Sequence, residues 1–534
     1  MAEHPPGRRP RRAGLRRHAP RPATPLALAA ARCGFGLSGG GLAVPVARGG
    51  CSRGLELGHG PWLPGPRPSV DARRSLADGR RGLCDHRRAG RPERGAGPVN
   101  CLPPDHRERR GERVLLVWGD LPFWVVVDRA ADRLIARLAE GLDAAEALAS
   151  AAEGGPDRGL RRDGAAVLAQ LRKAGVIGNR RLRPSRERIE SISVNVTRRC
   201  NLRCRFCYNE ERGIEGRELS AEEMIAALDS VRRWTAPGAA LALLGGEPLL
   251  EPEKTLALGE WGRRRGLRPI VSTNGLLVGP AFARSAARIG LDVQVSIDGP
   301  TAAGHEAVRG EGTFRRAIEA VELLVSSGAR TILSMVFHAG NAGEIPKYMR
   351  LARRLGAHEA RFIPLKQIGG GADFRPPDLA GVVRLVRDTL AAEPELRPLL
   401  GRDYYSILAQ TCQTCSPRPG CGTGSQTFLL DADGTVYPCI NLTDPMFAAG
   451  SVREDSLGRI WRRSVVLQDV RQRAPTAARP ETCGRCFVRH WCMGGCRGES
   501  RAGTGRLDAP SATCRQHRAS ILEMMWTLAG EGIS

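Results

Sequence analysis

The stretch Cys200-Asn-Leu-Arg-Cys204-Arg-Phe-Cys207 places three cysteines at the spacing C-x3-C-x2-C in one short segment. The preceding residues, 189–196, alternate apolar and polar side chains and predict a strand that ends just before the segment. Thiolates are soft ligands suited to iron–sulfur clusters, and a cubane cluster with four irons keeps one iron free when only three cysteines bind it. Because an open position on a metal usually marks reactivity, this loop predicts a catalytic cluster.

Strand and helix patterns alternate from the start of this strand to residue 366. Repeated strand-then-helix units indicate a parallel sheet with right-handed crossovers. Six units are too few for a closed barrel of eight, so the predicted fold class is α/β, a partial (β/α)6 TIM-like barrel over residues 189–366. The expected strands are 191–196, 240–244, 269–273, 292–297, 331–336 and 360–364, and the expected helices lie near 221–234, 252–265, 280–289, 314–327 and 343–355.

Polar clusters follow the first four predicted strands, at the rim where such barrels place their active groups. After the cysteine loop come Gly245-Gly246-Glu247-Pro248, then Asn274-Gly275, then Ser296 and Asp298. Glycines let backbone approach a ligand closely, and backbone carbonyls or Glu247 could accept from an ammonium group. The alternatives are ordinary tight turns at the glycines and helix capping by Ser296 and Asp298.

Cysteines return in the last quarter of the chain, in short-range patterns typical of metal ligation. A single C-x2-C pair would favour a zinc knuckle, whereas the full set has enough thiolates for two more cubane clusters. We therefore predict a cysteine-rich iron–sulfur domain over 411–520, a linker and helix over 367–410, and a C-terminal tail over 521–534. The cysteines are Cys412, Cys415, Cys421, Cys439, Cys483, Cys486, Cys492, Cys496 and Cys514.

The N-terminal residues 1–110 are rich in Arg, Pro and Gly and show no sustained apolar period. Such a segment cannot bury enough apolar surface to offset its ordering entropy, so we expect a disordered or mis-assigned extension. A targeting signal is the alternative, since arginine pairs precede an apolar stretch. Cys33, Cys51, Cys84 and Cys101 lack ligand spacing and are given no role.

A small hairpin-and-helix module is predicted over residues 111–188. The apolar runs 113–118 and 123–128 flank a Gly-Asp-Leu-Pro turn, and three helical patterns follow. A hairpin with three helices indicates a winged-helix-like fold. The module could bind a partner, act as a DNA-binding wing, or serve only as a structural cap.

The net charge of +25 on 534 residues invites a nucleic-acid partner, but its distribution argues against one. Residues 1–110 hold 22 Arg and 8 Asp or Glu, a net of +14, which leaves +11 for the other 424 residues. No apolar run reaches the ~18 residues of a membrane span. Thiols that load clusters must stay reduced, so we expect a cytoplasmic protein with no nucleic-acid or membrane partner.

The three-cysteine loop, together with Gly245–Pro248 after the second strand, resembles the radical SAM family. The resemblance implies a [4Fe–4S] cluster on Cys200, Cys204 and Cys207, with S-adenosyl-L-methionine (SAM) at the open iron. It also implies SAM contacts, and Arg309 matches the arginine that grips the SAM carboxylate. The implied SAM-contacting residues are Gly245, Gly246, Glu247, Pro248, Asn274, Ser296, Asp298 and Arg309, with Phe206 and Tyr208 packed near cluster and adenine or simply in the core.

The C-terminal cysteines resemble the SPASM signature, with all seven of its positions filled. By this resemblance Cys415, Cys421, Cys439 and Cys496 hold one auxiliary [4Fe–4S] cluster, and Cys483, Cys486, Cys492 and Cys514 hold a second. Cys412 is an alternative to Cys415. Sulfatase-maturing relatives carry an aspartate base directly after the cysteine that matches Cys439, whereas this chain has Ile440, so no general base is assigned.

The module at 111–188 resembles the RiPP recognition element, the fold of the pyrroloquinoline quinone peptide chaperone. In that family a precursor's leader peptide adds as a strand to the hairpin edge. The combined resemblance implies a radical SAM oxidoreductase that uses a 5′-deoxyadenosyl radical to form a C–S (thioether) or C–C cross-link in a ribosomally made precursor peptide. Its implied partners are that peptide and an electron donor such as flavodoxin or ferredoxin. Alternatives are a quinone-cofactor peptide cyclase or other protein-modifying enzyme, a DNA-binding redox regulator, and a non-catalytic iron–sulfur scaffold.

Overall fold

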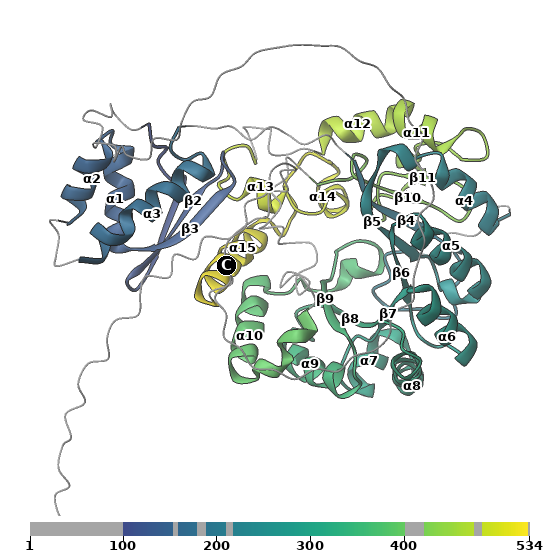
Figure 1. Cartoon of the computed structure of the whole chain (residues 1–534). Coiled ribbons are helices and arrows are strands. Elements are labelled where there is room, and N and C mark those ends of the chain that lie inside the picture. Colours follow the sequence, from purple (N-terminus) through teal and green to yellow (C-terminus); the bar gives the residue numbers. More distant parts are fainter. Residues whose placement is uncertain are drawn as a thin grey trace, which may run out of the picture. The chain divides into compact units, whose positions relative to one another are not determined.

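A single sheet of eight strands, in the order β11-β10-β4-β5-β6-β7-β8-β9, forms the centre of the computed structural model (Figure 1). The structure describes residues 100–152, 158–178, 188–209, 217–400, 421–474 and 483–531. The six predicted parallel strands are confirmed, and only β5 begins more than two residues from its expected start. They are β4 (Ile189–Asn195), β5 (Thr235–Leu244), β6 (Arg268–Thr273), β7 (Asp292–Ser296), β8 (Thr331–Phe337) and β9 (Glu359–Pro364).

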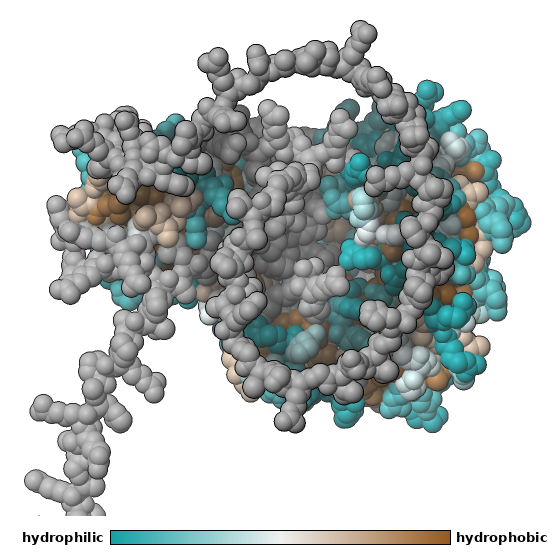
Figure 2. Space-filling model, viewed as in Figure 1, coloured by the Kyte–Doolittle hydropathy of each residue, from teal (hydrophilic) through white to brown (hydrophobic). Residues whose placement is uncertain are grey.

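Helices connect these strands and cover the outer side of the sheet (Figure 1). Leu243, Val271 and Val295 of the sheet are fully buried in the main core. On the side shown in Figure 2, hydrophilic residues predominate over the outer helices, with hydrophobic residues interspersed. The connecting helices are α4 (Ala221–Asp229), α5 (Pro252–Arg264), α6 (Pro280–Ile289), α7 (Ala302–Arg309), α8 (Thr313–Ser326) and α9 (Ile345–Arg354). Helix α7, only eight residues long, was not predicted.

Two short strands that the sequence did not predict extend the sheet beyond β4. Strand β10 (Thr427–Leu430) pairs in parallel with β4, and β11 (Val436–Tyr437) pairs antiparallel with β10. Asp431, at the end of β10, accepts from Asn195 Nδ2 at 3.0 Å and from Arg198 Nη2 at 2.6 Å. The cysteine loop follows β4, and the first C-terminal cysteines flank β10 and β11. The two cysteine regions are therefore attached to the same sheet.

The C-terminal helices pack against this sheet, and one of them corrects the predicted tail. Helix α10 (Leu379–Ala392) lies within the predicted linker-and-helix segment 367–410, whereas residues 521–531 are not a tail but the last part of α15 (Cys514–Glu531). Met524, Met525 and Leu528 of α15 are buried in the main core, and this apolar face explains why the segment folds. The shorter helices are α11 (Leu457–Arg463), α12 (Val465–Arg473), α13 (Arg489–Cys492) and α14 (Arg497–Thr504). None of the described helices is both long and apolar enough to cross a membrane.

The N-terminal module is a three-stranded antiparallel sheet, ordered β1-β2-β3, followed by three helices. One sheet face, including Leu116 and Trp118, packs on the module's own helices, and the other, including Leu115 and Trp124, belongs to the main core. Burial on both faces explains the continuous apolar runs in the hairpin strands. The elements are β1 (His106–Arg110), β2 (Arg113–Trp118), β3 (Phe123–Asp128), α1 (Arg129–Ala139), α2 (Ala144–Ala152) and α3 (Arg158–Ala174).

Strand β1 corrects the predicted boundary of the N-terminal extension, since residues 100–110 belong to the module. Its sequence, His-Arg-Glu-Arg-Arg, has no apolar alternation, and pairing with β2 along its whole length holds it in place. Cys101, for which the sequence suggested no role, is buried in the module's core. The rest of the expected extension, residues 1–99, lies outside the described residues.

Candidate active site

The cysteine loop after β4 is fixed by backbone hydrogen bonds from two distant segments. Arg205 N donates to the carbonyl of Val308 at 2.9 Å, and Gly370 N donates to the carbonyl of Cys207 at 3.0 Å. The structure brings together the thiols of Cys200, Cys204 and Cys207, which interact electrostatically. Burial raises the pKa of Cys200 and Cys204, and the neighbouring thiols add to the shift.

The glycine pair after β5 lies directly against this loop. Gly246 N donates to the carbonyl of Thr197 at 2.9 Å, and Glu247 N donates to that of Arg199 at 2.8 Å. A Cβ on Gly245 would lie 2.2 Å from Thr197 O, and one on Gly246 would lie 2.0 Å from Arg199 O. Only glycine allows this close approach, so the pair shapes the cysteine loop.

Glu247, which the sequence predicted as an acceptor for a ligand, holds two strand ends together. The side chain is 1% exposed. Oε1 accepts from Leu249 N at 3.0 Å and from the Thr273 hydroxyl at 2.6 Å, and Oε2 accepts from Asn274 N at 2.8 Å. Burial raises the pKa of Glu247 despite these hydrogen bonds. Pro248, also buried, begins a short 3-10 turn, Pro248–Leu250.

Asn274, at the end of β6, is both a turn residue and a contact of the cysteine loop. Its Oδ1 accepts from Leu276 N at 3.0 Å, which closes a turn with Gly275 at φ +87°. Its Nδ2 donates to Asn201 Oδ1 at 2.7 Å. The sequence reasoning missed Asn201, although it lies between the first two cysteines of the motif.

Asp298, after β7, is buried and orients Arg309. Its Oδ1 accepts from Val336 N at 2.7 Å and its Oδ2 accepts from Arg309 Nε. The guanidinium of Arg309 lies 3.9 Å from Cys204 Sγ. The structure therefore places Arg309 beside the cysteine loop, while the carboxylate of Asp298 is engaged by protein donors. Ser296, the last residue of β7, is half-buried.

Phe206 and Tyr208 have different neighbours. Phe206 meets Phe374 edge-on at 6.0 Å between ring centroids and lies 5.9 Å from the Arg309 guanidinium. Tyr208 is 37% exposed and lines a cavity of about 460 Å³. The opposite wall of the cavity includes Asn441, Asp444 and Arg501. The cavity thus lies between the end of the cysteine loop and the C-terminal cysteine region.

The described C-terminal cysteines form two separate electrostatic groups. Cys421, Cys439 and Cys496 interact with one another, and burial raises the pKa of Cys439 to about 12. In the second group burial also raises the pKa of Cys492 to about 12. That group comprises Cys483, Cys486, Cys492 and Cys514. Cys412 and Cys415 lie outside the described residues.

Two polar residues that sequence reasoning missed organise the first group. Asn441 Nδ2 donates to Cys496 Sγ at 3.3 Å. Arg497, 1% exposed, donates to the carbonyls of Leu507 at 2.7 Å and Ala509 at 2.9 Å. The only sequence signal for these two residues is their closeness to cysteines. Asn441 lies two residues after Cys439, and Arg497 directly follows Cys496.

These thiols fit iron–sulfur clusters chemically. Buried thiols with raised pKa values remain protonated unless a metal cation compensates the thiolate charge. In the described part of the chain no three His, Cys, Asp or Glu side chains converge on a single ion. A polynuclear cluster does not require such convergence, because each thiolate binds its own iron.

The fold and site define a parallel α/β enzyme with a three-thiol loop at the strand ends and a cysteine-rich C-terminal region. Residues 194–352 match the radical SAM superfamily, and residues 421–487 match SPASM, an iron-sulfur cluster-binding domain. The chain belongs to the radical SAM superfamily and carries a SPASM domain. The radical SAM domain binds a [4Fe–4S] cluster and SAM, and the SPASM domain binds auxiliary iron–sulfur clusters.

Similar proteins include enzymes that are named for different activities. Mycofactocin maturase MftC from Mycobacterium ulcerans is 31% identical over 332 residues, which span 61% of this chain and 87% of that protein. PqqA peptide cyclase from Granulibacter bethesdensis is 27% identical over 330 residues (60% and 86%). AdoMet-dependent heme synthase from Methanosarcina barkeri is 27% identical over 333 residues (59% and 93%).

Solved structures share the fold at lower sequence identity. Native anSMEcpe with bound AdoMet and a Cp18Cys peptide aligns with a TM-score of 0.52 and 19% identity, covering 65% of this chain and 99% of that one. Streptococcus suis SuiB bound to S-adenosylmethionine aligns with a TM-score of 0.50 and 14% identity, covering 76% and 97%.

Proposed function

We propose that this enzyme modifies a ribosomally synthesised precursor peptide by forming a thioether or C–C cross-link. The observation that carries the proposal is the cavity of about 460 Å³ between Tyr208 and the SPASM segment around Asn441. It adjoins both the three-thiol loop and, through the bond from Asn441 to Cys496, the first auxiliary thiol group. A side chain held there would lie beside both cysteine regions.

The cysteines are assigned to three clusters in this proposal. Cys200, Cys204 and Cys207 hold the SAM-binding cluster; Cys421, Cys439 and Cys496, with Cys415 or Cys412, hold the first auxiliary cluster, and Cys483, Cys486, Cys492 and Cys514 hold the second. When bound, the cluster and SAM supply a 5′-deoxyadenosyl radical that abstracts hydrogen from the peptide. The chain's own residues position that chemistry and exclude water.

Several side chains have positioning roles in this scheme. Gly245 and Gly246 allow the backbone to approach the loop closely, and Glu247 joins the ends of β5 and β6 beneath it. Arg309 supplies a fixed positive charge next to Cys204, where it can attract the SAM carboxylate. Asn274, Ser296 and Phe206 are proposed to line the rest of the SAM site, and Tyr208 the peptide side.

We further propose that the N-terminal module, residues 100–178, binds the leader of the precursor. The order β1-β2-β3 places β1 and β3 at the edges of its sheet, where an extended peptide can pair. The electron donor is proposed to be a flavodoxin or ferredoxin, and the compartment the reducing cytoplasm. The similarity to PqqA peptide cyclase supports a quinone-cofactor peptide cyclase as the second candidate.

Anaerobic incubation of the reconstituted enzyme with SAM, a reductant and the short peptide encoded beside its gene tests the proposal. Mass spectrometry should show a loss of about 2 Da per cross-link, because each new bond removes two hydrogens. The fragment spectrum shows which bond is formed, since a thioether requires a cysteine at the cross-link and a C–C bond does not. Formation of 5′-deoxyadenosine without any mass change in the peptide would refute the peptide assignment.

A further inference from the structure

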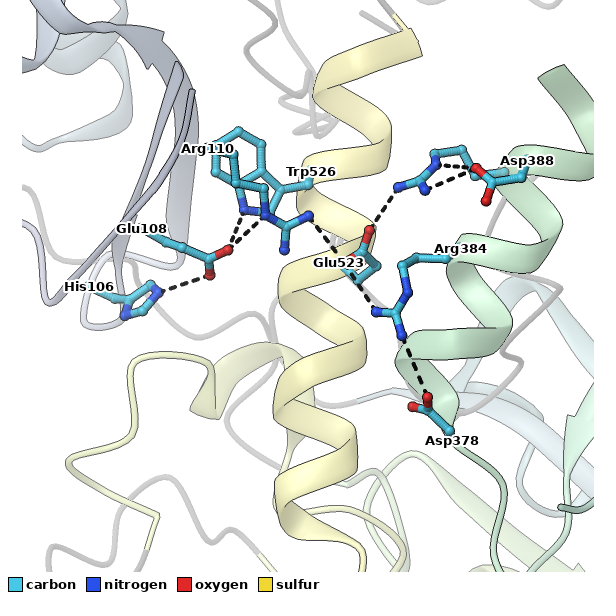
Figure 3. Close-up of polar contacts among 9 residues, drawn as sticks. His106, Glu108, Arg110, Asp378, Arg384, Asp388, Glu523 and Trp526 are labelled. Atoms are coloured by element: carbon cyan, nitrogen blue, oxygen red, sulfur yellow. Dashed lines mark hydrogen bonds and ion pairs between the residues drawn. The ribbon is translucent and has the colours of Figure 1, made fainter. Parts of the chain in front are cut away.

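A buried carboxylate on α15 is surrounded by three arginines from two other elements (Figure 3). Glu523 is only 4% exposed. Its oxygens lie 3.1 Å from Arg110 Nη1, 3.5 Å from Arg384 Nη1 and 2.8 Å from Arg387 Nη1. Arg110 ends β1 of the N-terminal module, and the other two arginines lie on α10. One negative charge thus faces three positive charges.

The remaining acidic neighbours compensate this excess weakly. Asp378, which pairs with Arg384, is 71% exposed, and Asp388, which pairs with Arg387, is 67% exposed. Exposed pairs of this kind are screened by water and salt. Glu108 pairs with Arg110 and also accepts from Trp526 Nε1 at 3.0 Å, so its charge is shared. The three arginines between β1, α10 and α15 therefore share one buried carboxylate, and their other acidic partners are partly or largely exposed.

A cavity of about 420 Å³ opens at this cluster, and we call it the arginine pocket. Its wall contains three guanidinium side chains, an indole and a threonine that is 2% exposed. The hydroxyl of this threonine, Thr527, has no hydrogen-bond partner among the residues that the structure describes. The Arg110 guanidinium lies over the Trp526 ring at 4.9 Å, which holds it at the wall. The lining includes Arg110, Arg387, Arg397, Trp526, Thr527 and Gly530.

We propose that the arginine pocket binds a carboxylate side chain in the leader of the precursor peptide. The inference rests on the proposed function, because it assumes a peptide substrate. Paired N–H donors of arginine match the two oxygens of a carboxylate. The occupant is a peptide because the pocket is bounded by β1, an edge strand on which an extended segment can pair. The volume of the arginine pocket also exceeds that of one carboxylate group, because a carboxylate is only a few times larger than a water molecule, which occupies about 30 Å³.

The direct test is ¹⁹F NMR of the full-length, cluster-loaded enzyme labelled with 5-fluorotryptophan. The Trp526 resonance is assigned as the signal absent from Trp526→Phe. N-acetyl-glutamate N-methylamide, the matching glutamine derivative and inorganic phosphate serve as probes at constant ionic strength. A saturable shift with the glutamate probe alone supports the proposal. No shift with that probe, or an equal shift with phosphate, overturns it.

Two variants distinguish ligand binding from a structural role of the cluster. Arg387→Gln should weaken binding of the glutamate probe at least tenfold. Glu523→Gln removes the internal competitor for the arginines, so it should tighten binding at least threefold. The matched control is Arg264→Gln on α5, an exposed arginine whose pair with Glu260 lies on the same helix. Unchanged or weaker binding in Glu523→Gln contradicts the proposal, and this result does not depend on whether Arg387→Gln folds.

A peptide experiment separates this inference from the proposed function. The short peptide encoded beside the gene is compared with a version in which every leader Asp and Glu is replaced by its amide. The KM should rise at least tenfold for the amide version with kcat little changed, and this difference should vanish in Arg387→Gln. Cross-linking of both versions with equal KM overturns the arginine pocket alone. No cross-linking of either version overturns the proposed function, and a glutamate probe that still binds then leaves the arginine pocket as a carboxylate site without a peptide substrate.

Discussion

The Nη1 atom of Arg309 lies 3.9 Å from the sulfur of Cys204. Arg309 is the last residue of α7, the helix that follows β7. The same guanidinium donates through Nε to Asp298, which is fully buried. A cation fixed in this way counters the charge of a thiolate at Cys204. The end of β7 and the cysteine loop after β4 are therefore linked through one arginine.

Asp298 and Arg309 should show strong energetic coupling. Arg309→Gln leaves a buried carboxylate without its partner, which costs about 3–5 kcal/mol. Asp298→Asn alone should cost a similar amount, and the double variant should cost much less than the sum of the two. Urea unfolding of the four proteins under anaerobic conditions gives the coupling energy, expected at about 2 kcal/mol or more. Simple additivity of the two changes would contradict this.

Gly246→Ala should impair loading of the SAM-binding cluster. The new Cβ would lie 2.0 Å from the Arg199 carbonyl, so the cysteine loop has to move. Gly343→Ala is the matched control, because a Cβ there meets nothing within 4 Å and the backbone has no positive φ. Iron content and SAM affinity after reconstitution should fall in Gly246→Ala only. Equal values in the two variants would show that the loop tolerates the displacement.

Removing one cysteine from each auxiliary group should remove different clusters. Cys439→Ala and Cys492→Ala should each lose about four irons, and the double variant about eight, because in the proposed assignment each group binds its own cubane cluster. Cys101→Ala is the control, since this cysteine is buried in the N-terminal module. Iron analysis and Mössbauer spectroscopy measure the loss, and circular dichroism verifies the fold. Loss of both auxiliary clusters from a folded single variant would refute the prediction that the two cysteine groups bind their clusters independently.

Because His305 is held neutral in the folded protein, the free energy of unfolding should fall as the pH falls from about 6.5 to about 4. Burial lowers its pKa from 6.5 to about 4, so in this window the unfolded chain binds a proton that the folded chain does not. The contribution of His305 to the free energy of unfolding is fully present above pH 6.5. It is lost as the pH falls toward 4, by on the order of 3 kcal/mol. His305→Asn keeps an acceptor for the Asp298 amide, which donates to His305 Nδ1 at 3.1 Å.

Urea unfolding at several pH values should therefore give a shallower slope for His305→Asn than for the wild type. His517, whose pKa burial lowers to about 3, contributes equally to both proteins and continues the decline at lower pH. Parallel curves for the two proteins would show that His305 is already protonated in the folded state.

The main sheet could be predicted from sequence because its parallel strands are short apolar or alternating runs that recur between helical patterns. Strands β10 and β11 could not, since Thr427–Leu430 and Val436–Tyr437 are too short to show a period. Strand β1 is charged throughout and is stabilised by pairing rather than by apolar burial. The tail prediction for 521–534 failed because cysteine spacing, which set that boundary, says nothing about the apolar face of α15.

The cysteine spacings indicated which residues could be ligands, but not the contacts that position them. The two auxiliary groups implied by the SPASM resemblance are also the groups in which the described thiols interact, with Cys415 outside the described residues. Asn201, Phe374 and Arg497 contact the site through pairings that depend on three-dimensional proximity. The inward orientation of Glu247 likewise follows from the donors Thr273 and Asn274, which come from another strand.

Helix α15 begins at Cys514, in the second auxiliary thiol group, and carries Trp526 at the arginine pocket. Twelve helical residues separate these positions, a rise of about 18 Å at ~1.5 Å per residue. An extended peptide advances at most about 3.4 Å per residue, so it needs at least about six residues to cover that length. The helix thus sets a minimum spacer between an anchored leader carboxylate and any residue modified beside Cys514, and precursors with shorter spacers would be excluded by length alone.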